Sequence, residues 1–188
     1  PQLLEETFRP TTYTADEIFV ASDLNIYYST QNHLWYKRPD WFAVVGTSRF
    51  YRQRDLRLSY VIWQEGINPF VAVELLSPRT EKEDLGQAAQ ATAADQPPRK
   101  WQVYEQILRV PYYVVFDRYC DQLQVFHLVS GHYEALDLAD NRLWIPELKI
   151  GLGAWQGTYQ GIERLWLRWF EAGDRWIPTP EEQTTAAD

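Results

Sequence analysis

The pattern of apolar and polar positions predicts two short buried strands, each associated with one acidic residue. Residues 41–45 read WFAVV and follow Asp40, while residues 70–76 read FVAVELL and contain Glu74. Runs of this length, rich in Val, Phe and Leu and bounded by Pro or Gly, are typical of strands covered on both faces. A carboxylate in such a strand loses its hydration, so it requires a partner cation, hydrogen bonds or a metal ion.

Further strands are predicted on both sides of this pair. Residues 111–117 form a third apolar run, and 122–128 alternate as its hairpin partner would. Weaker signals of the same kind lie in residues 17–28, 33–37, 58–64, 132–136 and 148–152.

Two helices are predicted from spacing. Apolar residues at positions 101, 104, 107 and 108 follow Pro98, which favours a helix over residues 99–108. Residues 160–171 show an amphipathic pattern that predicts a second helix, and we expect the polar tail from residue 178 to fray. This order of elements indicates an α/β protein of the α+β type, with a central mixed sheet flanked by helices. A chain of 188 residues fits one domain, here residues 1–188.

Charge narrows the range of partners. The net charge of −8 argues against broad adhesion to nucleic acid, because phosphate neutralisation dominates that affinity. A local basic surface is still available between the two acidic strands, where Arg49, Arg52, Arg54 and Arg57 lie. These arginines form either a solvated hairpin or a loop that contacts phosphates beside the site.

Two features of the sequence bear on membrane association and on the cellular compartment. No apolar run approaches the roughly 20 residues that span a bilayer, so we expect no membrane partner. The single cysteine, Cys120, excludes an internal disulfide and suits a reducing cytoplasm.

The two acids match half of a known catalytic pattern. A Pro-Asp at one strand followed by a Glu on the next is the acidic part of a Pro-Asp…(Asp/Glu)-x-Lys nuclease site, and these hard oxygens suit Mg²⁺ or Mn²⁺. The lysine should follow Glu74 by two residues, but Leu76 occupies that position.

A wider set of motifs resembles the Uma2 family, also called DUF820. These motifs are VELLSPRT at 73–80, DLG at 84–86, KWQVY at 100–104 and VPYYVVFD at 110–117. The resemblance extends from about residue 40 to 128 and implies a restriction-endonuclease-like core. In that family a helix lysine, four residues before a tyrosine, replaces the strand lysine, and Lys100 and Tyr104 match. The chain departs from the family pattern because residues 87–99, with two prolines, precede Lys100, and Lys82 is the competing lysine.

The resemblance implies an endonuclease that hydrolyses DNA, with Asp40, Glu74 and Lys100 as its catalytic residues. Mg²⁺ or Mn²⁺ would bind Asp40, Glu74 and the backbone carbonyl of Leu75. Residues expected to surround these ligands are Asp84, Lys82 and Tyr104. For Asp84 alone, a helix N-terminal carboxylate favoured by the helix dipole is an equal interpretation. A homodimer would suit double-strand cleavage.

Two other functions stay open. The insertion before Lys100 and the acidic charge also fit a nuclease-fold module that binds nucleic acid or a protein without cutting. The abundance of aromatic residues suggests a carbohydrate-related function. However, Trp101, Trp166 and Trp169 fall at spacings typical of a core, which weighs against it.

Overall fold

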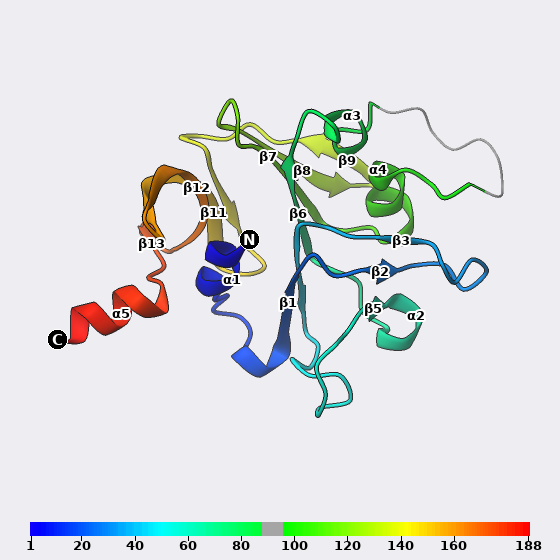
Figure 1. Ribbon diagram of the computed structural model, residues 1–188, viewed down its shortest axis with the longest axis horizontal. Coiled ribbons are helices and arrows are strands. Elements are labelled where there is room, and N and C mark those ends of the chain that lie inside the picture. Colours follow the sequence, from blue (N-terminus) through cyan, green and yellow to red (C-terminus); the bar gives the residue numbers. More distant parts are fainter. Residues whose placement is uncertain (88–95) are drawn as a thin grey trace.

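The computed structural model describes residues 1–87 and 96–188, and its centre is a mixed six-stranded sheet (Figure 1). The strands, in spatial order, are β1 (Ile18–Ser22), β4 (Trp41–Val45), β6 (Val71–Leu76), β7 (Tyr112–Asp117), β8 (Gln122–Val129) and β9 (His132–Ala135). Only β6 and β7 pair in parallel; the other neighbours are antiparallel. The predicted mixed sheet is therefore confirmed, including the two acidic strands and the hairpin at 111–128.

Two smaller sheets complete the strand content. One has the order β10 (Arg142–Ile145), β11 (Ile150–Tyr159), β12 (Ile162–Glu171) and β13 (Arg175–Trp176); the other has β3 (Tyr36–Lys37), β2 (Ile26–Tyr27) and β5 (Tyr60–Val61). The uncertain stretch 17–28 thus supplies β1 and β2, and the apolar segment 148–152 contains the start of β11. The short helical element η1 (Ala15–Glu17) precedes β1, α2 (Ile62–Glu65) lies between β5 and β6, and α3 (Glu81–Asp84) follows β6.

Both faces of the central sheet are buried, as the continuous apolar runs predict. Trp41 and Ala43 of β4 pack into one core, whereas Phe42 and Val44 pack into the other, because side chains alternate along a strand. The first core is closed by α1 (Gln2–Thr7) and the β10–β13 sheet; the second is closed by the β3–β2–β5 sheet and the helix after residue 99. Figure 1 shows these two layers on opposite sides of β6.

The helix predicted over residues 99–108 is confirmed and has an unusual second half. It begins as α4 (Lys100–Gln102) and continues as the π-helix η2 (Val103–Ile107), where Leu108 N–H donates to Val103 O at 2.8 Å. Wide turns of this kind are rare and often occur at functional sites. Part of the insertion that precedes this helix, residues 88–95, lies outside the described residues.

The helix predicted over residues 160–171 is wrong: these residues form β12 and the turn that leads into it. Gln160 and Gly161 both have positive φ and join β11 to β12 in a tight two-residue hairpin. The apolar residues fit helical spacing because the strand buries both faces, so its bulky positions are almost continuous. Cross-strand pairs such as Trp155 with Trp166 stabilise the hairpin instead.

The polar tail, expected to fray, forms helix α5 (Pro180–Ala187). Thr179 and Glu182 make a capping box, and Pro180 occupies the first turn. Glu182 also pairs with the buried Arg168 of β12, which ties the helix start to the β10–β13 sheet.

Candidate active site

Asp40 and Glu74 meet at one end of the β4–β6 pair. Trp41 pairs with Val73 in the antiparallel register, so one step further places Asp40 opposite Glu74. Asp40 Oδ2 accepts a hydrogen bond from the backbone N–H of Leu75 at 2.6 Å. A strand residue directs its N–H and C=O to the same side, so the Leu75 carbonyl lies on the β4 side of β6. The carboxylates of Asp40 and Glu74 are close enough to interact electrostatically.

Glu74 is buried, at 2% exposure, and each of its oxygens has a partner. The Tyr104 hydroxyl donates to Oε1 at 2.8 Å, and the Lys100 ammonium lies 3.3 Å from Oε2. Lys100 also donates to Asp84 Oδ1 at 2.6 Å, and Asp84 is itself buried. Lys100 thus lies between two carboxylates, within the range at which charges couple strongly.

The α4–η2 helix places Lys100 and Tyr104 on one face. Residues four apart in a helix are neighbours, so both side chains reach Glu74 from the same side. Gly86 allows this helix to approach closely: its φ is +72°, and a Cβ there would lie 2.7 Å from the Trp101 ring. Tyr113 of β7 fixes the same corner by donating to Asp84 O at 2.6 Å.

Leu76 occupies the position where the strand lysine was expected. It projects to the same face as Glu74 and is buried with Ile26 and Phe42 in the second core. The cation beside Glu74 is instead Lys100 of the helix, at the position that the resemblance to the Uma2 family implies. Lys82, the competing lysine, is exposed on α3.

Negative charge exceeds positive charge at this point. Burial raises the pKa of Glu74 to about 8; Lys100 opposes the shift, whereas Asp84 and Asp40 add to it. Burial also raises the pKa of Asp84, again against Lys100. Burial alone would lower the pKa of Lys100, but Glu74 and Asp84 outweigh it and raise the pKa, so the ammonium stays charged. A further cation would relieve this excess.

The donor set fits a hard divalent cation. Among the residues that the structure describes, no three Asp, Glu, His or Cys side chains gather into a cage for a metal ion. Mg²⁺ commonly uses one or two carboxylates and completes its shell with water and substrate phosphate. Asp40, Glu74 and the Leu75 carbonyl supply such a partial set.

The arginines of the 46–57 loop lie at the opposite end of β4. Five strand residues separate Asp40 from this loop, about 17 Å of extended chain. In Figure 1 the loop is the cyan segment at the bottom, while α3 and α4 lie at the top right. The structure does not bring these arginines to the carboxylates. Arg52 and Arg54 are exposed, and Arg57 is held by Glu65 at 2.9 Å.

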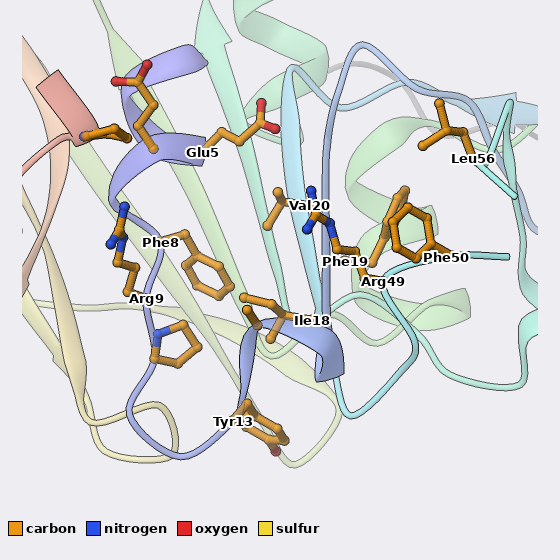
Figure 2. Close-up of a pocket in the computed structure, with 14 residues that line it drawn as sticks. Glu5, Phe8, Arg9, Tyr13, Ile18, Phe19, Val20, Arg49, Phe50 and Leu56 are labelled. Atoms are coloured by element: carbon orange, nitrogen blue, oxygen red, sulfur yellow. The ribbon is translucent and has the colours of Figure 1, made fainter. Parts of the chain in front are cut away.

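Arg49 borders a different surface feature. A groove of about 630 Å³ follows the outer strand β1, and Figure 2 shows Arg49 beside Phe19 and Phe50 in its wall. The Arg49 guanidinium lies 5.3 Å from the centre of the Phe50 ring. The residues that line this groove include none of the three predicted catalytic residues.

Two charged residues beside the site, Glu83 and Lys37, were not predicted from the sequence. Glu83 Oε1 accepts from the backbone N–H of Lys100 at 3.3 Å and lies 3.9 Å from the Lys37 ammonium. Lys37 belongs to β3, and only the fold brings this strand near α3. In the sequence, only the position of Lys37 three residues before Asp40 indicates that it lies near the site.

The mixed central sheet and the acidic pair with its helix lysine define a protein with a restriction-endonuclease-like fold. A family model described as Uma2, putative restriction endonuclease, matches residues 2–158, and the chain belongs to this family. Comparison with curated proteins gives no match. None of the helices in residues 1–87 and 96–188 combines the length and apolar character needed to cross a bilayer.

Proposed function

We propose that the protein is a Mg²⁺- or Mn²⁺-dependent endonuclease that hydrolyses phosphodiester bonds of DNA. The observation that carries the proposal is the contact of one ammonium, that of Lys100, with two buried carboxylates beside Asp40. A structural ion pair needs one carboxylate for each cation, whereas this cluster has an acidic excess. Family membership supports the same class of activity.

In this proposal Asp40, Glu74 and the Leu75 carbonyl hold the metal ion. The metal, when bound, would polarise a phosphoryl oxygen and lower the pKa of the attacking water. Asp40 is kept in position by the Leu75 N–H, and Glu74 by the Tyr104 hydroxyl. Burial, with Glu74 next, raises the pKa of Tyr104, so the hydroxyl stays protonated and donates.

Lys100 would act as an electrostatic stabiliser. Its raised pKa keeps the ammonium charged, so it is suited to stabilise negative charge that develops at the phosphoryl group rather than to accept a proton. Asp84 holds the ammonium in place at 2.6 Å and is the positioning residue for this role. Lys100 lies in α4 and Tyr104 in the π-helix that continues it.

The test is nicking of supercoiled plasmid by purified protein with Mg²⁺ or Mn²⁺. We expect cleavage by the wild type and loss of cleavage in Asp40→Asn and Glu74→Gln. Glu163→Gln, which changes an exposed carboxylate on β12, is the matched control and should cleave normally. Undiminished cleavage by Glu74→Gln would contradict the proposal, because the activity would then come from elsewhere.

A second candidate is a module that binds nucleic acid or a protein partner without cutting. It is favoured by one observation: Lys100 and Tyr104 already give both Glu74 oxygens partners without a metal. Calorimetric titration with Mn²⁺ separates the two functions. Binding that requires Asp40 supports the endonuclease, and absence of such binding supports the module.

The proposal also includes a homodimer, since two sites related by a two-fold axis could cleave both strands of a duplex. Sedimentation velocity with and without duplex DNA measures this directly. A protein that cleaves both strands as a monomer would contradict the dimer but not the catalytic residues.

A further inference from the structure

Lys37 lies beside the candidate site and has no part in the chemistry described above. Its ammonium lies 3.9 Å from Glu83 Oε1, and the same oxygen accepts from the backbone N–H of Lys100 at 3.3 Å. Glu83 therefore links Lys37 to Lys100, the first residue of α4. The Lys37 side chain is 14% exposed, so most of it is buried while a small part is accessible to solvent beside the site.

The contact with Glu83 is an ion pair that does not engage the Lys37 ammonium in a hydrogen bond. A separation of 3.9 Å is too long for a hydrogen bond, although the charges still attract. Burial lowers the pKa of Lys37; Glu83 opposes this, and Lys100 and Arg99 add to it. Glu83 is thus the ion-pair partner of Lys37. An incoming phosphate oxygen would offer the ammonium the hydrogen bond that the 3.9 Å contact does not provide.

A substrate phosphate is the anion that suits this place. The arginines of the 46–57 loop lie at the other end of β4. Cations that bind phosphates next to the carboxylates must therefore come from other elements. Lysine binds phosphate as a compact point charge and does not require the flat geometry of a guanidinium. β3 presents Lys37 on the same side of the central sheet as α3 and α4.

We propose that Lys37 contacts a backbone phosphate of the nucleic acid next to the bond held at Asp40 and Glu74. In this arrangement Glu83 orients the ammonium in the free protein, and the phosphate takes its place in the complex. The inference rests on the proposed function, since it names how the same site holds its substrate. Lys37 is a binding residue here and takes no part in the bond cleavage.

A purely structural Lys37–Glu83 pair makes a different prediction. If the pair only stabilises the fold, Lys37→Gln and Glu83→Gln should affect the protein in the same direction. If Lys37 binds phosphate, the two changes act in opposite directions on DNA affinity. Glu83→Gln removes a competing negative charge, yet its amide oxygen can still accept from the Lys100 N–H.

The experiment measures the affinity of the full chain for a fluorescein-labelled DNA duplex by anisotropy, with Ca²⁺ in place of Mg²⁺. We expect Lys37→Gln to bind about tenfold more weakly and its dependence of log affinity on log salt to be shallower by about 0.9. Glu83→Gln should bind more tightly, and Lys37→Arg should retain most of the affinity. Arg175→Gln, which removes an exposed charge on β13, is the matched control and should change affinity less than twofold.

Three outcomes decide the inference. The opposite effects just described, in variants that melt like the wild type, support it. Equal effects of Lys37→Gln and Glu83→Gln, or no effect of Lys37→Gln while the wild type binds and nicks DNA, overturn the role of Lys37 and leave the endonuclease intact. A wild type that neither binds the duplex nor nicks plasmid overturns the endonuclease, and the inference with it.

Discussion

Two buried ion-pair clusters in this molecule differ in charge balance: one is neutral and the other has an excess of acid. Two nitrogens of the Arg57 guanidinium donate to the Glu65 carboxylate, at 2.9 and 3.2 Å. The third donates to the carbonyls of Ser48 and Arg49. The guanidinium also covers the Phe19 ring at 4.4 Å. One cation therefore meets one carboxylate, and the remaining donors are satisfied within the protein.

The Lys100 cluster is built differently. One ammonium serves Glu74 and Asp84, and the carboxylate of Asp40 lies beside them at the Leu75 N–H. The pKa of Glu74 is raised to about 8, primarily by burial. Burial of charge alone does not mark a functional site, because both clusters are buried. The uncompensated acid is what distinguishes the Lys100 cluster.

The largest expected effect is on cleavage. Glu74→Gln should reduce plasmid nicking at least about 100-fold, because it removes a ligand and a charge from the reacting centre. Glu65→Gln, the equivalent change in the Arg57 cluster, should cleave within twofold of the wild type once folded. Equal losses in the two variants, measured as initial nicking rates, would show that the clusters do not differ in function.

The next effect is on stability, where the clusters should behave alike until metal is added. Lys100→Gln and Arg57→Gln each leave buried carboxylate without its cation, which costs about 3–5 kcal/mol of unfolding free energy in urea denaturation. Mg²⁺ should restore part of the loss in Lys100→Gln, since a divalent ion can replace the missing charge. If Mg²⁺ restores both variants equally, the metal does not bind at the Lys100 cluster.

The pH dependence of stability follows from the raised pKa of Glu74. The folded protein holds a proton on Glu74 up to about pH 8, whereas the unfolded chain loses it near pH 4.5. Its contribution is complete below about pH 4.5 and is lost as the pH rises to 8, at up to about 1.4 kcal/mol per pH unit. Urea denaturation across this range should show wild type losing stability relative to Glu74→Gln. A constant difference between the two would contradict the raised pKa.

The smallest predicted effect concerns the corner that carries α4. Gly86→Ala should destabilise the protein by about 1–3 kcal/mol, because of its positive φ and the contact with Trp101. Gly66→Ala is the matched control: it has a similar φ of +76° but open space around the added carbon. Thermal melts should therefore show a larger loss for Gly86→Ala, and cleavage should fall with it as Lys100 shifts.

Much of the candidate site could be predicted from the sequence because its signals are local. Asp40 and Glu74 adjoin or lie within apolar runs that read as buried strands, so each carboxylate stands out in the sequence. Lys100 and Tyr104 are four residues apart in a helix, which requires no knowledge of tertiary structure. The family resemblance supplied their pairing with the strand acids, and family membership is confirmed.

The remaining features depend on contacts between distant segments. The contact of Lys37 with Glu83 joins β3 to α3, and no local pattern encodes it. The helix prediction for residues 160–171 was wrong because closely spaced bulky residues occur both in a strand buried on both faces and in an amphipathic helix. The helix at Pro180 was predictable, since Thr179 and Glu182 match the capping-box pattern. The polar composition of the tail favoured a frayed end instead.

Titration of the metal-free protein with Mn²⁺ by calorimetry near pH 7 tests the central claim most directly. We expect one strong site that requires both Asp40 and Glu74 and persists in Glu65→Gln. Binding should release a proton, because Glu74 must ionise. Mn²⁺ binding that is unchanged in Asp40→Asn and Glu74→Gln would contradict it.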